Sequence, residues 1–151
     1  MRAATCALLF LVGLTIPVPQ FGAQAVGCSG SGCTGYNPQS MRCGTGAQTG
    51  PWGEFADGSV VENRYNTTCN AEWERTTNDS GGSRYAAGSI LYPLPDWNDS
   101  QDVSSPGTIS NGATVYTPMV GPRSINTSNC GDVSTVGPID IPVTIHCVAP
   151  G

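Results

Sequence analysis

The sequence predicts an all-β fold class, a small antiparallel β-sandwich or barrel stapled by disulfides. Three observations support this prediction. Short segments rich in β-branched and aromatic residues are separated by Gly, Pro and Asn turns. No apolar stripe with the period and length of a helix appears. The chain of 151 residues also contains seven cysteines.

The charge composition argues against one class of partner. Only 11% of the residues are charged, lysine is absent and the formal net charge is -5. A nucleic-acid binder needs a basic face, and so acidic a chain lacks one. We therefore expect no nucleic-acid partner.

The first 25 residues read as a secretory signal peptide, which leaves residues 26–151 as a single exported β-domain. Arg2 supplies the positive start, and the apolar stretch 7–16 is too short to span a bilayer. Ala23-Gln24-Ala25 offers a small-x-small cleavage site. No later run is long enough for a transmembrane segment, so we expect a secreted, extracellular protein, with association to the cell envelope left open. A lipid on Cys28 is the alternative, because a small residue precedes it.

Six cysteines remain once Cys6 leaves with the signal peptide: Cys28, Cys33, Cys43, Cys69, Cys130 and Cys147. An even number in an exported chain points to three disulfides, although many pairings are possible. We favour the local pairing Cys28–Cys33, Cys43–Cys69 and Cys130–Cys147, because the cysteines fall into a group of four and a pair. The chain has no C-x-x-C pairs and only one histidine, so we expect no metal site and no cofactor.

The elements follow in chain order. Residues 26–53 hold eight glycines and three cysteines, which predicts a loop-rich lead-in. Strand composition marks residues 59–65, 71–77, 83–92, 113–117 and 143–147. Turn signals separate them at Asp57-Gly58, at residues 78–82 and at Asn111-Gly112. Residues 93–112, with three prolines, predict one long polar loop.

A possible polar cluster lies on the first two predicted strands. Glu62 and Arg64 share one strand face, and Trp73 and Arg75 share a face of the next strand. If the two strands pair antiparallel, a glutamate lies between two arginines with an indole beneath a guanidinium. The ordinary interpretation is a cross-strand network that stabilises the sheet. The functional one is a recognition site for a carboxylate or a sugar, since Arg and Trp suit both.

Two further groups of acids could carry chemistry. Glu72 and Glu74 lie on one strand face about 7 Å apart, within the spacing of glycosidase carboxylates, but any alternating strand gives that spacing. The acidic stretch 96–102 offers a possible calcium or turn loop, with Asp96, Asn98, Asp99 and Asp102 as oxygen ligands. A solvated turn is the ordinary interpretation, because Asp and Asn are common turn residues.

Two tryptophans have an ambiguous role. Trp52 and Trp97 can each plug the core or form an exposed stacking platform. Burial is the commoner outcome for an aromatic side chain, so we expect the core role for Trp97, and Trp52 carries the same ambiguity.

Three motifs carry a family resemblance. They are Cys33-Thr-Gly-Tyr-Asn-Pro38 with Cys43, the run from Gly58 to Arg75 that contains V-E-x-R-Y and W-x-R, and Tyr116-Thr-Pro-Met-Val120. Together they resemble the YjfA-like family of exported bacterial proteins, a domain of unknown function, over residues 28–147. The chain departs from that pattern at Asn37, where an Asp is usual, and at Asn66, where a Ser is usual. The resemblance implies export from a bacterium and supplies no activity.

These observations favour a secreted, non-enzymatic domain whose partner is a cell-wall polymer or an extracellular protein. No Gly-x-Ser-x-Gly motif occurs, and a single histidine makes no convincing triad. The alternative is a secreted hydrolase inhibitor that presents the 93–111 loop. A carbohydrate hydrolase that uses Glu62 or Glu72 is the third hypothesis.

Overall fold

The computed structural model describes residues 25–92, 99–123, 126–137 and 145–149. The predicted signal peptide lies outside this part of the chain, apart from Ala25. No helix among the described residues has the length and apolar character needed to cross a membrane.

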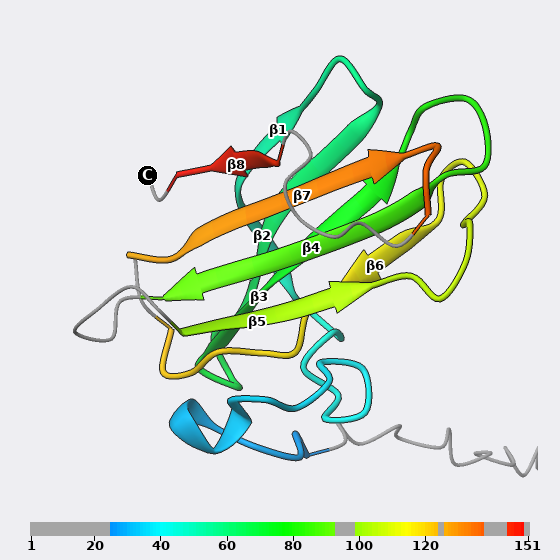
Figure 1. Cartoon of the computed structure of the whole chain (residues 1–151). Helices are drawn as coiled ribbons and strands as arrows, with labels where there is room; N and C mark the ends of the chain where they lie inside the picture. The colour runs from blue at the N-terminus through cyan, green and yellow to red at the C-terminus, as the bar shows by residue number, and fades with distance from the viewer. Residues whose placement is uncertain (1–24, 93–98, 124–125, 138–144, 150–151) are drawn as a thin grey trace, which may run out of the picture.

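Two four-stranded antiparallel sheets form the domain, as Figure 1 shows. The first sheet has the order β1-β2-β3-β6, with β1 (Gln48–Glu54), β2 (Ser59–Asn66), β3 (Ala71–Asn78) and β6 (Thr114–Tyr116). The second has the order β5-β4-β7-β8, with β5 (Asp99–Ser104), β4 (Tyr85–Tyr92), β7 (Ser128–Ser134) and β8 (His146–Val148). The sheets face each other in two layers, so the predicted all-β sandwich is confirmed.

Local chemistry explains the connections between strands. Gly58 has φ +84°, a conformation that glycine adopts without strain, and it closes the turn between β1 and β2. The Asp57 carboxylate accepts hydrogen bonds from the backbone N–H and the hydroxyl of Ser59 at 2.8 and 2.6 Å. The Asn78 side chain donates to the carbonyls of Gly82 and Ile109, which fixes the passage from the first sheet to the second. The turn signals in the sequence therefore mark real turns.

Three strands, β1, β5 and β7, lie where the sequence predicted none. The end of the predicted lead-in forms β1, and residues 99–104 of the predicted loop form β5, so the prediction of one continuous loop over 93–112 was wrong. Both are edge strands, which need only one partner and tolerate the proline and polar residues that hid them. The inhibitory finger imagined for residues 93–111 therefore includes a strand hydrogen-bonded to β4. Residues 93–98 lie outside the described residues.

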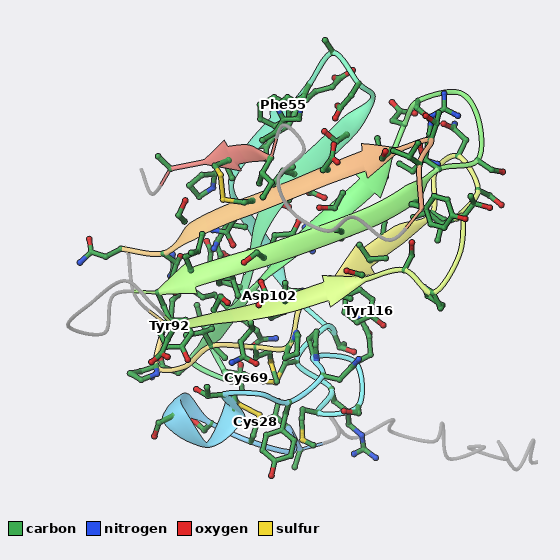
Figure 2. The ribbon with its side chains drawn as sticks, viewed as in Figure 1. Cys28, Phe55, Cys69, Tyr92, Asp102 and Tyr116 are labelled. Carbon is green, nitrogen blue, oxygen red and sulfur yellow. A yellow bond between two sulfur atoms is a disulfide. The ribbon has the colours of Figure 1, made fainter. Side chains whose placement is uncertain are left out.

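The three disulfides have the local pairing favoured from the sequence: Cys28–Cys33, Cys43–Cys69 and Cys130–Cys147. Cys28 is therefore committed to a disulfide, which leaves no free thiol for the alternative lipid anchor. The first bridge lies within the lead-in, and the second joins the lead-in to the turn between β2 and β3; both are at one end of the molecule, where Figure 2 labels Cys28 and Cys69. The third joins directly paired residues of β7 and β8.

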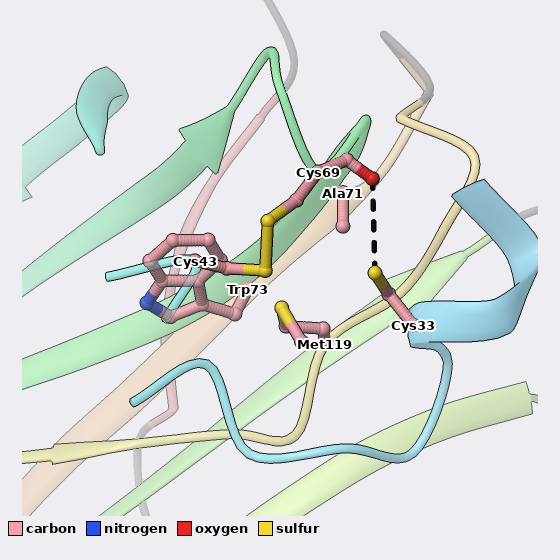
Figure 3. Close-up of a cluster of buried hydrophobic side chains, with 6 residues drawn as sticks. All are labelled: Cys33, Cys43, Cys69, Ala71, Trp73 and Met119. Atoms are coloured by element: carbon pink, nitrogen blue, oxygen red, sulfur yellow. Dashed lines mark hydrogen bonds between the residues drawn. A yellow bond between two sulfur atoms is a disulfide. The ribbon is translucent and has the colours of Figure 1, made fainter. Parts of the chain in front are cut away.

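The lead-in packs on the outer face of the first sheet and makes a small core there. Its short 3-10 helix, Gly30–Cys33, begins this covering segment. Figure 3 shows the buried residues of the cluster: Cys33, Cys43, Cys69, Ala71, Trp73 and Met119. The lead-in therefore covers one part of that outer face and leaves the rest open.

Candidate binding face

One row of side chains crosses the outer face of the first sheet, from the exposed Trp52 to Tyr116, which packs against the cluster under the lead-in. Trp52 pairs with Glu62, Glu62 pairs with Arg75, and Arg75 pairs with Tyr116. Directly paired residues project on the same side of a sheet. We call these four residues the aromatic–arginine row. It spans all four strands, with an aromatic ring at each end and charged groups in the middle.

The row projects away from the second sheet. The neighbouring inward residue is Val61, which is fully buried and pairs with Gly53. A Cβ on Gly53 would contact Val148 of the second sheet, so this side of the first sheet faces the interior. Because side chains alternate along a strand, Trp52 and Glu62 must face outward.

Ion pairs order the centre of the row. The Glu62 Oε2 atom lies 2.6 Å from Arg75 Nε and 2.5 Å from Arg75 Nη2. Its Oε1 atom lies 3.8 Å from Arg64 Nη1. Arg64 is also held by the Thr49 hydroxyl and by the Ala47 carbonyl. Two guanidinium groups thus share one carboxylate, and the group carries one net positive charge in an acidic protein.

The side chains of the two arginines are exposed to different extents. Desolvation lowers the pKa of Arg64, the nearby charge of Arg75 lowers it further, and Glu62 acts in the opposite direction. Arg64 nevertheless keeps its charge, because a guanidinium titrates far above neutral pH. The Arg75 side chain is 33% exposed, so its guanidinium is more accessible to a ligand than that of Arg64.

The structure brings together three of the four residues of the predicted polar cluster. Glu62, Arg64 and Arg75 meet on one face through the antiparallel register of β2 and β3. Trp73 projects on the same side but packs against the Cys43–Cys69 disulfide under the lead-in. It therefore serves the core and not a guanidinium. The cation–π contact that the structure shows instead places Arg123 3.7 Å from the ring centre of Tyr65.

Trp52 is the row residue whose place the sequence left ambiguous. It is 61% exposed and does not plug the core. Trp52 lies on edge strand β1 just past an irregularity in the pairing with β2. Its position opposite Glu62 could have been found only from the register, which the sequence does not specify. Trp97, the other ambiguous tryptophan, lies outside the described residues.

The two carboxylates considered for glycoside hydrolysis lie on the opposite face of the sheet. Glu72 is buried between the sheets and accepts hydrogen bonds from Asn63 Nδ2 at 3.0 Å and Thr127 Oγ1 at 3.2 Å. Glu74 is fully buried, and this burial raises its pKa well above the usual range, while the Thr76 hydrogen bond acts in the opposite direction. Neither carboxylate can reach a glycan at the surface.

The residues of the predicted calcium loop are placed only in part. Asp96 and Asn98 lie outside the described residues. Asp99 and Asp102 are on the extended strand β5, not in a turn, and Asp102 accepts a hydrogen bond from Ser100 at 2.7 Å. In the described chain, the sulfurs of Cys28, Cys33 and Cys43 are the only potential metal ligands that cluster in threes, and all are in disulfides.

Comparison with known proteins adds one finding. A family model described as "Protein of unknown function (DUF2690)" matches residues 31–130. This range includes the whole aromatic–arginine row. No curated protein and no solved structure matches the chain.

Proposed function

Since the chain belongs to the DUF2690 family, whose function is unknown, we propose its function from the binding face: it is an exported, non-enzymatic domain that binds an acidic cell-wall glycan. The observation that carries this proposal is the aromatic–arginine row on an open sheet face. Three disulfides support export, because such bonds persist in oxidising compartments.

The chemistry of the row suits a sugar polymer with carboxylate groups. The exposed Trp52 ring offers a flat apolar surface for the C–H face of a pyranose ring. Arg75 gives two of its N–H groups to Glu62 and has others available for a ligand carboxylate. The extra guanidinium of Arg64 makes the centre of the row attractive to an anion, although the protein as a whole is acidic.

Binding is favoured over hydrolysis by the state of the carboxylates. Glycoside hydrolysis uses two carboxyl groups about 5 to 9 Å apart on either side of the scissile bond. On the open face Glu62 is held between Arg64 and Arg75, and the two ends of the row, Trp52 and Tyr116, carry no acid. Glu72 and Glu74 project from the other side of the sheet.

Retention on insoluble bacterial peptidoglycan tests the proposal. We expect the wild-type protein to sediment with peptidoglycan, and Trp52→Ala to weaken retention by about tenfold or more, as for a central aromatic contact. Tyr36→Ala is the matched control, because Tyr36 is an aromatic residue of similar exposure, 52%, on the lead-in. Equal retention of Trp52→Ala and wild type would refute the role of this face.

A second comparison tests the acidic character of the ligand. Arg75→Gln should lose retention on peptidoglycan, and added salt should weaken the retention of the wild-type protein in the same way. Chitin, a neutral polymer, should retain wild type and Arg75→Gln equally weakly. Stronger retention on chitin than on peptidoglycan would contradict an acidic ligand.

A further inference from the structure

A small hollow lies on the outer face of the second sheet, on the other side of the molecule from the aromatic–arginine row. Its floor contains Ala87 and Ser89 of β4. Asp102 of β5 lies beside Ser89, and Asp132 of β7 lies beside Ala87. Gly88, which lies between Ala87 and Ser89 on β4, faces inward, because a Cβ there would meet the Glu74 carboxyl between the sheets. The hollow therefore opens outward. Figure 2 labels Asp102 on this face.

The size and the lining of the hollow limit its ligand. Its cavity volume is about 70 Å³. Its outward-facing lining includes the apolar side chains of Ala87 and Ile145 and the half-cystine Cys130. Only a small group fits, and it has to be apolar over most of its surface.

Asp132 is the buried acid among the polar residues of this wall, which also include Ser89 and Asp102. The residue is only 5% exposed, and its Oδ2 atom has no hydrogen-bond partner. A buried carboxylate oxygen without a donor is costly, so the hollow contains an acceptor that lacks a cationic or N–H partner.

The hydrogen bonds of Asp132 to Asp57 and to the backbone N–H of Val133 leave its Oδ2 atom without a partner. Asp57 is itself a carboxylate, held by Ser59 and by His146, whose Nε2 lies 3.1 Å from Asp57 Oδ2. Burial, followed by the hydrogen bond and the charge of Asp57, raises the pKa of Asp132 to about 6, and His146 acts in the opposite direction. Above that pH two ionised carboxylates adjoin each other.

We propose that this hollow binds a primary alkylammonium group, such as the end of a lysine side chain. The –NH3⁺ group donates a hydrogen bond to Asp132 Oδ2, and its methylene chain contacts Ala87 and Ile145. Asp102 on the far side adds negative potential. A metal ion fits less well, because no three carboxylate or imidazole groups of the described residues gather closely enough to surround one. The inference is independent of the proposed glycan site.

Titration with n-butylammonium chloride, followed by NMR chemical shifts at pH 8, tests the inference. We expect saturable shifts of the Ala87 and Asp132 amides, with 1-butanol binding at least about tenfold more weakly. Asp132→Asn should weaken butylammonium binding by about tenfold, whereas Asp99→Asn, an exposed acid on β5, should keep it. Lowering the pH well below 6 should also weaken binding, because Asp132 gains a proton.

A second variant keeps the test decisive if Asp132→Asn fails to fold. Ala87→Leu fills the hollow without changing a charge and should abolish the butylammonium shifts. Unchanged binding in Ala87→Leu, equal affinity for 1-butanol, or no saturable shift in the wild type would each overturn the inference.

Discussion

At the scale of single residues, Glu74 is the most unusual feature of the interior. Its carboxyl is fully buried between the sheets and accepts a hydrogen bond from the Thr76 hydroxyl, while its other oxygen has no partner. Burial raises the pKa of Glu74 well above its usual range, since the charged form loses its hydration. The protein therefore holds a carboxyl group that keeps its proton to higher pH than an exposed glutamate does, at a place where a sandwich ordinarily has an apolar side chain.

Glu74→Gln should make stability less dependent on pH. The folded state keeps the Glu74 proton to higher pH than the unfolded state does, so the free energy of unfolding falls as pH rises above about 4.5. A glutamine stays neutral at every pH. We therefore expect Glu74→Gln to melt several degrees higher than wild type at pH 8 and at nearly the same temperature at pH 4.

Thermal denaturation between pH 4 and pH 8, followed by circular dichroism, measures this difference. Glu54→Gln is the control, because Glu54 is an exposed glutamate on β1 whose loss should leave the pH dependence unchanged. If Glu74→Gln retained the wild-type pH dependence, burial would not raise the pKa of Glu74 as described above.

At the scale of elements, two glycines allow β4 and β7 to approach this acid. Gly88 and Gly131 pair with each other across the two strands. A Cβ on Gly88 would meet the Glu74 carboxyl, and one on Gly131 would meet the Thr76 hydroxyl. The sheets can therefore pack closely over polar side chains only because these two positions have no side chain.

Gly88→Ala should destabilise the domain by about 3 kcal/mol through overpacking. Glu74→Asp shortens the opposing side chain, so the double variant should recover at least about 1 kcal/mol relative to the sum of the two single changes. Urea denaturation of the four proteins gives this coupling energy. Gly107→Ala, at a position with open space around it, should change stability by less than about 0.5 kcal/mol. Strict additivity of Gly88→Ala and Glu74→Asp would mean that the two side chains do not compete for space.

The sequence predicted those strands whose composition follows the rules for a half-buried sheet. β2, β3 and β4 contain β-branched and aromatic residues between clear turns, and the structure has them where expected. β7, with the sequence Ser-Asn-Cys-Gly-Asp-Val-Ser, was missed although it is central in its sheet. Its small and polar residues suit an interior that contains Glu74, and composition alone cannot reveal such an interior.

The binding face was predictable in its centre and not at its edges. Alternation along β2 and β3 places Glu62 and Arg64 on one strand face and Arg75 on one face of the next strand, so one antiparallel register brings the three together, and the structure has it. The different environments of Trp52 and Trp73 depend on which part of the sheet the lead-in covers. The part of the sheet that the lead-in covers is set by contacts between residues distant in the chain, so no local sequence pattern predicts it.

At the scale of the whole molecule, the two proposed sites should act independently. The aromatic–arginine row and the Asp132 hollow lie on opposite outer faces, with both sheets between them. Trp52→Ala should therefore leave butylammonium affinity unchanged, and Asp132→Asn should leave retention on peptidoglycan unchanged, each within about twofold. If either variant lost both butylammonium binding and retention on peptidoglycan, the substitution would be disturbing the whole fold and not one of two separate sites.

The lead-in and its disulfides decide how much of the first sheet is open, and the two bridges there should not contribute equally. Cys43–Cys69 closes a separation of 26 residues and Cys28–Cys33 one of 5. Loop-closure entropy gives about 3.5 kcal/mol for the longer loop and about 2 kcal/mol for the shorter one. Replacing both Cys43 and Cys69 by serine should therefore lower the free energy of unfolding by more than replacing Cys28 and Cys33.

The fluorescence of Trp73 gives a second readout. The buried Trp73 packs against the longer bridge, so only the variant without Cys43–Cys69 should show a red-shifted tryptophan emission before global unfolding. An equal loss from both variants, with Trp73 still shielded, would mean that sheet contacts and not the Cys43–Cys69 bridge hold the lead-in in place.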